Sequence, residues 1–296
     1  MTSSTNYRSY LYVPAHKAAV VEKAYASDAD AIVLDLEDAV PATHKAAARE
    51  AAAAILAAGP AKPTYVRVNP YSSPWCRDDV AAIALPALKA LPALKALRLP
   101  KCDAPQEIRE VAAWLDALGS AAGIQILIES AYGVETAYQL ATASPRLERI
   151  GLGESDLRAD LQIGADNFTL EVCRARCVVA ARAAGLAGPI QTVYHTLTDL
   201  DGLRESTLRA KSMGFVGRFA IHPSQVPVIN EVFTPSADEI EAAERILDAL
   251  DAAAGASSAS SVFVLPDGRV VAPPLIANAR VTLALAGNLR SNGVLS

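Results

Sequence analysis

Two acidic side chains follow two successive short apolar runs near the middle of the chain. Glu129 closes the run at residues 124–129, and Asp156 closes the segment that begins at residue 149. The carboxyl ends of neighbouring strands in a parallel barrel meet at one mouth, so we expect the two carboxylates to lie close together. Two carboxylates at one site repel each other unless a cation lies between them. Because hard oxygen ligands suit Mg²⁺ and leave positions for water and substrate, the pattern predicts a magnesium site.

Three further charged residues stand where other predicted strands end. Arg67 lies in the run at residues 63–69, and an arginine in a buried strand needs an anionic partner. Its planar fork suits a substrate carboxylate or a developing oxyanion, and an ion pair with an acid of the preceding strand is the alternative. Glu37 and Asp38 follow the second predicted strand, where they can orient metal-bound waters. Capping of the next helix is the alternative for Asp38.

A lysine and the histidines complete the candidate set. Lys101 follows the fourth predicted strand, where it can neutralise the acids, contact substrate or form a plain salt bridge. His222 ends the last predicted strand and suits either general acid–base chemistry or a structural hydrogen bond. His195 and His16 carry a weaker signal. The sequence contains no GxSxG, HExxH or GxxxxGK[ST] motif, so nothing indicates a serine hydrolase, a zinc protease or a phosphate-binding loop.

The elements that position these residues follow from hydrophobic periodicity. Short apolar runs alternate with longer segments of helical period through the first 234 residues. The eight runs fall near residues 10–14, 31–36, 63–69, 96–100, 124–129, 149–153, 190–195 and 219–222. This order predicts an α/β fold, a TIM (β/α)₈ barrel that forms a catalytic domain over residues 1–234. An open doubly wound sheet is the alternative.

A C-terminal extension is predicted over residues 235–296. It comprises a helix at residues 236–253, a small-residue hinge at 254–261, a hairpin at 262–271 and a last helix at 274–289. The hairpin is predicted to turn at Asp267-Gly268. A helix–hairpin–helix appendage after a hinge suits a lid, a packing tail or an oligomer contact.

Composition excludes several other classes of protein. The chain has 296 residues, 52% of them apolar, and a net charge of −5. No basic stretch tracks a nucleic-acid backbone, and no apolar stretch reaches the ~18 residues of a membrane span. The N-terminus has no pattern of a secretion signal. The four cysteines form no CxxC pair, so we expect buried thiols and a cytoplasmic protein. They are Cys76, Cys102, Cys173 and Cys177.

Seven short motifs recur in order along nearly the whole chain, and together they resemble the citrate lyase β-subunit-like branch of the HpcH/HpaI aldolase family. They are Arg8-Ser-Tyr-Leu-Tyr-Val-Pro14, Asp35-Leu-Glu-Asp-Ala-Val40, Val66-Arg-Val-Asn69, Leu99-Pro-Lys101, Ile128-Glu-Ser130, Gly153-Glu-Ser-Asp-Leu157 and Ile221-His-Pro-Ser-Gln225.

This resemblance implies an Mg²⁺-dependent enzyme that cleaves or forms a C–C bond in an acyl-CoA. The family is often trimeric or hexameric, so a homo-oligomer, such as a homotrimer, is implied. The implied substrate is a β-hydroxyacyl-CoA such as citryl-, malyl- or citramalyl-CoA, and the products are a keto acid and an acyl-CoA. Glu129 and Asp156 resemble the family's metal ligands, and Arg67 resembles the arginine that binds the keto acid. Glu37 and Asp38 resemble groups that orient metal waters.

In the same way, Arg67, Glu129, Lys101 and His222 are expected to contact substrate. Two departures from the family pattern stand out. Ala15 replaces a glycine after the first strand, and Ala272 replaces an aspartate that in many relatives reaches a neighbour's active site. Loss of that acid would impair enolate protonation or thioester hydrolysis. A keto-acid aldolase that does not use CoA, and a non-catalytic ligand-binding subunit of a multi-subunit lyase, therefore remain alternatives.

Overall fold

The computed structural model describes residues 6–84, 94–164, 167–255, 262–265 and 268–291. Contacts between Cα atoms divide the chain into two compact units, residues 1–231 and residues 232–296. We describe each unit by itself. The predicted roles of a catalytic domain over 1–234 and a lid or oligomer contact over 235–296 stay predictions.

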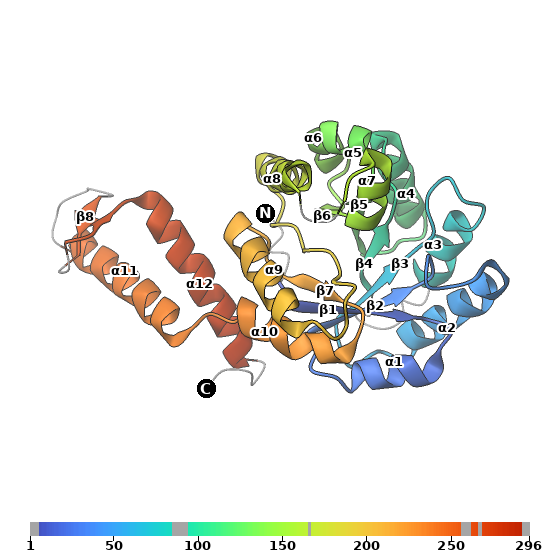
Figure 1. Cartoon of the computed structure of the whole chain (residues 1–296), viewed down its shortest axis with the longest axis horizontal. Helices are drawn as coiled ribbons and strands as arrows, with labels where there is room; N and C mark the ends of the chain where they lie inside the picture. The colour runs from blue at the N-terminus through green and yellow to red at the C-terminus, as the bar shows by residue number, and fades with distance from the viewer. Residues whose placement is uncertain (1–5, 85–93, 165–166, 256–261, 266–267, 292–296) are drawn as a thin grey trace. The chain divides into compact units, whose positions relative to one another are not determined.

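The first unit is an α/β fold built on a curled parallel sheet of seven strands (Figure 1). The strand order is β6-β5-β4-β3-β2-β1-β7, so consecutive strands lie side by side. The strands are almost entirely buried, as in parallel sheets whose faces are both covered. They are β1 Ser9–Pro14, β2 Ala31–Asp35, β3 Thr64–Arg67, β4 Leu94–Leu99, β5 Gly123–Ile128, β6 Leu147–Leu152 and β7 Arg218–Ala220.

Helices follow most strands and cover the outside of the sheet (Figure 1). The helical segment between β5 and β6 is divided at Thr136 into α5 and α6, and the connection between β3 and β4 contains the helix α3. The helices are α1 Ala18–Tyr25, α2 Lys45–Ala57, α3 Cys76–Ala84, α4 Pro105–Ala117, α5 Ala131–Glu135, α6 Ala137–Ala141, α7 Glu154–Leu161, α8 Phe168–Ala183, α9 Leu200–Met213 and α10 Val226–Phe233. A 3₁₀ turn, η1 Ala42–His44, precedes α2.

The strand predicted at residues 190–195 is not formed as an element. Gln191 makes only an isolated parallel bridge with Arg218 of β7. Beyond it, side chains take the carbonyls that a neighbouring strand would use. The Thr192 carbonyl accepts from Nε of Arg218 at 3.1 Å, and the Tyr194 carbonyl accepts from Nε2 of Gln225 at 2.7 Å. Backbone groups satisfied in this way need no strand partner, so the described sheet has seven strands instead of the predicted eight.

The second unit comprises two helices and a short hairpin. They are α11 Ala237–Gly255, β8 Phe263–Val264, β9 Val270–Val271 and α12 Pro273–Ser291. The two strands pair antiparallel, and Ile246, Leu265 and Ile276 belong to the unit's own hydrophobic core. Asp267 of the predicted turn and residues 256–261 of the predicted hinge lie outside the described residues.

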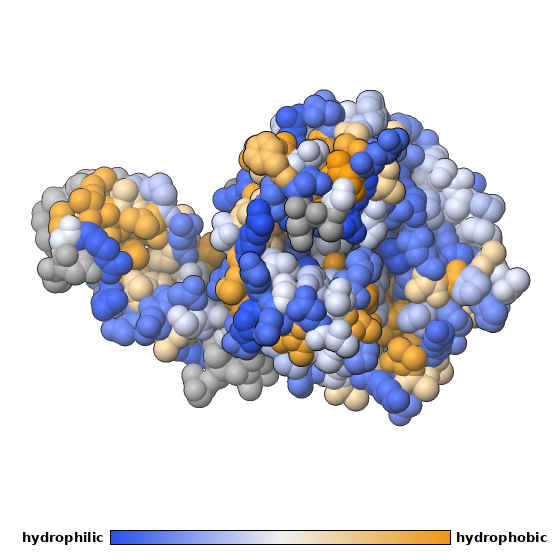
Figure 2. All heavy atoms as spheres, viewed as in Figure 1, coloured by the Kyte–Doolittle hydropathy of each residue, from blue (hydrophilic) through white to orange (hydrophobic). Residues whose placement is uncertain are grey.

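Apolar side chains also gather on the surface of this second unit (Figure 2). Val264 and Val281 are each 63% exposed. Exposed apolar side chains that gather in one region are typical of contact surfaces. The exposed apolar residues are compatible with the predicted lid, packing-tail or oligomer role of this unit, which stays a prediction.

Two further observations concern membrane helices and the cysteines. In the part of the chain that the structure describes, no helix combines the length and apolarity needed to cross a membrane. All four cysteines are buried and unpaired, as predicted.

Candidate active site

Arg67 is the centre of a cluster at the carboxyl ends of β2, β3 and β4. It ends β3 and is the register partner of Asp35, which ends β2. Its Nε and Nη2 donate to the two carboxylate oxygens of Asp35, each at 2.7 Å. Its Nη1 lies 2.8 Å from Glu37 Oε2 and 3.4 Å from Asp38 Oδ2. The ion pair with an acid of the preceding strand is therefore present, and it fixes the guanidinium beside the cavity described below.

Asp35 builds the turn that presents the other two acids. Its carboxylate accepts from the backbone N–H groups of Glu37 and Ala39, at 3.0 and 3.2 Å. Lys45 of α2 holds the same turn, because its ammonium donates to the Leu36 and Glu37 carbonyls at 2.7 and 2.8 Å. The sequence analysis named Asp35 only as the first residue of one family motif. Its position at the end of a buried strand was the signal for its role in positioning Arg67.

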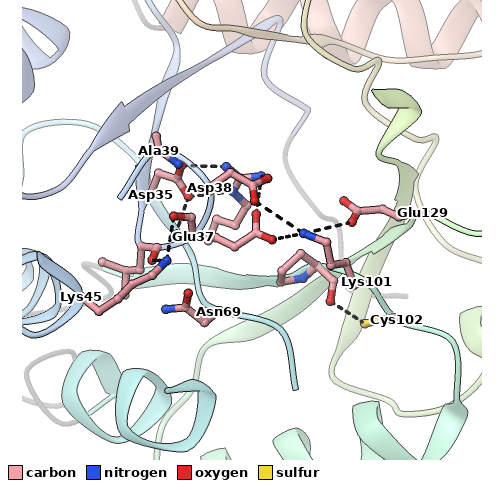
Figure 3. Close-up of polar contacts among 12 residues, drawn as sticks. Asp35, Glu37, Asp38, Ala39, Lys45, Asn69, Lys101, Cys102 and Glu129 are labelled. Carbon is pink, nitrogen blue, oxygen red and sulfur yellow. Dashed lines mark hydrogen bonds and ion pairs between the residues drawn. The ribbon is translucent and has the colours of Figure 1, made fainter. Parts of the chain in front are cut away.

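Lys101 connects the acids that follow β2 with Glu129 (Figure 3). Its Nζ lies 2.5 Å from Glu37 Oε1, 3.6 Å from Asp38 Oδ1 and 3.9 Å from Glu129 Oε2. The backbone φ of Lys101 is +54°, a conformation uncommon outside glycine. Burial lowers the pKa of Lys101, but the hydrogen bond to Glu37 and the nearby acids raise it above its usual value. The side chain therefore stays cationic between the two groups of acids.

Glu129 follows β5 directly and is only 7% exposed. Its Oε2 has no hydrogen-bond partner among the described residues. Burial raises the pKa of Glu129 to about 8; the charges of Glu37 and Asp156 act in the same direction, and Lys101 opposes them. A buried carboxylate with an unpaired oxygen carries an unmet demand for positive charge. This demand fits the predicted cation.

Gly153 makes room for Glu129. A Cβ atom at Gly153 would lie 2.2 Å from Glu129 Oε1, well inside the contact distance. A side chain at residue 153 would therefore displace the carboxylate. Gly153 also lies between the end of β6 and the first residue of α7. The same glycine therefore connects the strand to the helix and leaves space for the Glu129 carboxylate.

Asp156 was predicted to close the sixth strand, and the structure corrects this placement. β6 ends at Leu152, and Asp156 lies in the first turn of α7 with Glu154. Acidic side chains are favoured at a helix N-terminus, which explains the early start of the helix. Asp156 is exposed, and it lines the same cavity as Glu129.

The cavity has a volume of about 480 Å³, and Arg67, Asp38, Glu129 and Asp156 all line it. Among the described residues there is no group of three or more His, Cys, Asp or Glu side chains arranged to hold a metal. Protein-bound Mg²⁺ commonly uses one or two carboxylates and completes its shell with waters and substrate oxygens. The unpaired Oε2 of Glu129 together with Asp156 therefore fits that ion as a donor set.

The sequence favoured His222 over His195 as a residue of the site, and the structure places His195 at the cavity instead. Nδ1 of His222 accepts from the Ser224 backbone N–H at 3.2 Å and caps the 3₁₀ turn η3 Pro223–Gln225. His222 is not among the described residues that line the cavity. His195 does line it, and its Nε2 lies 3.0 Å from Ser155 Oγ. The structural hydrogen bond weighed for His222 is present, and its predicted contact with substrate stays a prediction.

Sequence reasoning missed two buried charges at this cavity. Glu154 accepts from Nε and Nη2 of Arg174 at 2.8 and 2.6 Å, and from Gln191 at 3.1 Å. Arg98 of β4 is 3% exposed and also lines the cavity. The signal for Arg98 was the one that singled out Arg67, an arginine within a buried apolar strand.

Residues 8–223 match the family model described as HpcH/HpaI aldolase/citrate lyase. The chain belongs to this family. It is 36% identical to a (3S)-malyl-CoA thioesterase of Cereibacter sphaeroides, over 97% of each chain. It is 31% identical to the citrate lyase subunit beta of Escherichia coli, covering 94% of this chain and 93% of that one.

A solved structure extends the likeness to three dimensions. The protein CitE from Mycobacterium tuberculosis, in complex with magnesium, acetoacetate and coenzyme A, superposes with a TM-score of 0.74 at 27% identity. The match covers 96% of this chain and 99% of that one. Membership of the family, inferred from seven short motifs, is thereby confirmed.

Proposed function

We propose that this chain is an Mg²⁺-dependent C–C lyase that cleaves or forms a β-hydroxyacyl-CoA, with a keto acid and an acyl-CoA as the other partners. The observation that carries the proposal is the buried Glu129 carboxylate, whose Oε2 has no hydrogen-bond partner among the described residues and which shares one cavity with Asp156 and Arg67. Family membership supports a lyase, and the relatives' names support a CoA thioester.

We infer that the sheet closes as a (β/α)₈ barrel, with the segment around Gln191 in the eighth position. The bridge between Gln191 and Arg218 supports this on the β7 side. On the β6 side, a Cβ placed at Gly151 would lie 3.7 Å from the Ile190 carbonyl oxygen. Closure would bring Glu129, Asp156 and Arg67 to one mouth, where (β/α)₈ enzymes place their active sites.

Glu129 and Asp156 would hold the magnesium ion. When bound, it would supply Lewis acidity that lowers the pKa of the substrate hydroxyl. Arg67 would bind the carboxylate of the keto-acid portion. Because Asp35 occupies Nε and Nη2 of Arg67, Nη1 is the group that would exchange its contact with Glu37 for the substrate carboxylate.

Glu37, Asp38 and Lys101 would tune the charge around the reacting atoms. Burial raises the pKa of Glu37, whereas Arg67 and Lys101 lower it. Once the Arg67 contact moves to substrate, Glu37 keeps Lys101 as its partner at 2.5 Å. Lys101 would then offset the negative charge that C–C cleavage delivers to the cavity.

The test is turnover by the purified chain with citryl-, malyl- and citramalyl-CoA. We expect at least one of the three to yield a keto acid and an acyl-CoA in a 1:1 ratio, and we expect chelation by EDTA to stop the reaction. Chromatography of the acyl-CoA and derivatisation of the keto acid measure the two products. Failure to cleave any of them with Mg²⁺ present would contradict the proposal and favour a non-catalytic subunit.

Thioester hydrolysis is a second candidate, because one relative at 36% identity is named a thioesterase. Hydrolysis releases free CoA thiol and a hydroxy acid without a keto acid, so a thiol reagent separates the two reactions. Ala272 follows β9, at the position where many relatives carry an aspartate. We expect slow thiol release by the natural chain and faster release by Ala272→Asp. No change in that variant would show that residue 272 has no part in hydrolysis.

A homo-oligomer in the cytoplasm is the state we propose for the working enzyme. The exposed apolar residues of the second unit, including Val264 and Val281, support a contact between copies. Analytical ultracentrifugation tests this directly: a trimer or hexamer is the expected result, and a monomer at high concentration would contradict it.

A further inference from the structure

Arg98 is a buried charge within the cavity that the proposed chemistry does not use. It belongs to β4, is 3% exposed and lines the same cavity as Arg67 and Glu129. In the sheet it is the register partner of Arg67 on one side and of Gln125 on the other. Neighbouring strands lie about 4.8 Å apart, so the two arginines extend from adjacent positions on adjacent strands.

The two arginines differ in how their charge is balanced. Arg67 has the Asp35 carboxylate on two of its nitrogens. No carboxylate among the described residues lies within ion-pair distance of Arg98. Its Nη1 donates to the neutral Gln125 amide oxygen at 3.1 Å, and its Nε has no hydrogen-bond partner in the described chain. Arg98 therefore retains a donor without an acceptor and a charge without a counter-ion.

The surroundings of Arg98 offset this charge only in part. The Phe219 ring centre lies 4.0 Å from its Cζ, and a cation–π contact is weaker than an ion pair to a carboxylate. Burial lowers the pKa of Arg98, contact with Tyr12 and the negative charge of Glu129 raise it, and the positive charge of Arg67 lowers it again. Because a guanidinium does not give up its proton in proteins, an anion that enters the cavity would supply the carboxylate that Arg98 lacks within ion-pair distance.

We propose that Arg98 binds a second anionic group of the substrate, so that this chain prefers a keto-acid portion with two carboxylates. The proposal rests on the proposed lyase function, in which Arg67 takes the first carboxylate. Arg67 and Arg98 extend from adjacent strands about 4.8 Å apart and line one cavity, so each could bind one carboxylate of a four-carbon keto diacid. A keto acid with one carboxylate would leave Arg98 unpaired, which gives a physical reason for discrimination.

Calorimetric binding of two keto acids in the presence of Mg²⁺ tests the proposal without relying on turnover. Oxaloacetate carries the second carboxylate, and pyruvate lacks it. The variant Arg98→Gln removes the charge and keeps a group that can hydrogen-bond to Gln125. We expect it to weaken oxaloacetate binding roughly 10- to 100-fold, because a buried charge pair is lost, and to change pyruvate binding less than about threefold. The matched control Arg67→Gln should weaken both ligands.

The outcomes separate this proposal from the proposed function. If the natural chain binds both keto acids and Arg98→Gln weakens both equally or neither, the second-anion role of Arg98 is wrong while the lyase proposal stands. If the natural chain binds neither keto acid with Mg²⁺, both proposals fail. Arg98→Lys keeps the charge and loses the fork, so it supplies the same comparison if the glutamine variant does not fold. A smaller loss, again confined to oxaloacetate, is expected for it.

Discussion

The two sides of the cavity treat their acids in opposite ways. On the side formed by β2, β3 and β4, Asp35 and Glu37 each have a cationic partner within 2.8 Å. On the side formed by β5 and α7, the carboxylate oxygen Oε2 of Glu129 has no hydrogen bond in the described chain, and Asp156 repels it. The acids of the first side are paired with cations without a ligand. The second side is balanced only when a cation binds, and the difference identifies which acids position substrate and which bind metal.

Glu129 and Glu154 show the same contrast between two single residues. Glu129 and Glu154 are both buried and both line the cavity. Glu154 is held in a two-point contact by Arg174, whereas the nearest cation to Glu129, Lys101, is 3.9 Å away. Burial alone therefore does not mark a ligand. What distinguishes Glu129 as a candidate metal ligand is that no cation of the described chain forms a hydrogen bond with its Oε2.

The largest expected effect is the contrast between Glu129→Gln and Glu154→Gln. Glu129→Gln should lower Mg²⁺-dependent turnover roughly 100-fold or more, beyond the loss typical of residues that only support a ligand. Its melting temperature should stay the same or rise, because an unpaired buried acid is removed. Glu154→Gln should instead cost about 1.5–3 kcal/mol of unfolding free energy, since Arg174 loses a charged acceptor.

Kinetics and denaturant unfolding on both variants measure this contrast. Loss of turnover in Glu154→Gln with normal stability would reverse the two assignments. Full activity in Glu129→Gln would remove the metal site altogether.

Gly153→Ala should produce the next largest effect. The new Cβ would lie 2.2 Å from Glu129 Oε1 and force that carboxylate aside. We expect roughly tenfold weaker Mg²⁺ binding, in line with misplacement of a ligand. Gly151→Ala is the matched control, because its Cβ would meet no atom closer than 3.6 Å. Equal Mg²⁺ affinity in both variants would show that residue 153 does not position Glu129.

Arg67→Lys tests the side of the cavity on which the acids are paired. A lysine keeps the charge and loses the fork that spans Asp35, so the cation no longer sits in a fixed orientation. We expect keto-acid affinity to fall about tenfold, with Mg²⁺ affinity nearly unchanged. Calorimetry with pyruvate measures the first quantity and a Mg²⁺ titration the second. A keto-acid affinity that does not change would count against Arg67 as the carboxylate-binding group.

The last prediction concerns a pH dependence of stability in the metal-free protein. The folded-state pKa of Glu129 is raised from its ordinary value of 4.5 to about 8. A raised pKa means that the folded state binds the proton more tightly than the unfolded state, so stability falls as pH rises through this range. Melting temperatures from pH 5 to 8 should therefore decline more in the natural chain than in Glu129→Gln. Parallel curves would show that Glu129 is not desolvated.

Much of this architecture was predictable because buried parallel strands read as short apolar runs with a charged residue at the end. That pattern located Arg67, Lys101 and Glu129 at strand ends. It failed for residues 190–195, where the Gln225 side chain takes a carbonyl that a strand would have used. Such contacts join residues far apart in sequence and leave no periodic trace.

The charged residues that were missed have a related cause. Arg98 lies within its strand instead of at the end, so a search for charged residues at strand ends passed over it, although it lines the cavity. The sequence favoured His222 over His195, because the deciding facts are not visible in it. His222 accepts from the Ser224 N–H in a local cap, and His195 lines the cavity from a segment that forms no strand. Sequence pattern indicates which residues stand near a strand end. The direction of each side chain depends on packing.

Calorimetric titration of the natural chain and of Glu129→Gln with Mg²⁺ near pH 7 tests the central claim most directly. Since the pKa of Glu129 is about 8 without metal, most molecules carry its proton at this pH and must release it on binding. Titrations in two buffers of different ionisation enthalpy count the released protons. We predict release of close to one proton by the natural chain and none by the variant, with far weaker binding in the variant. Equal Mg²⁺ affinity in the two proteins would contradict the account.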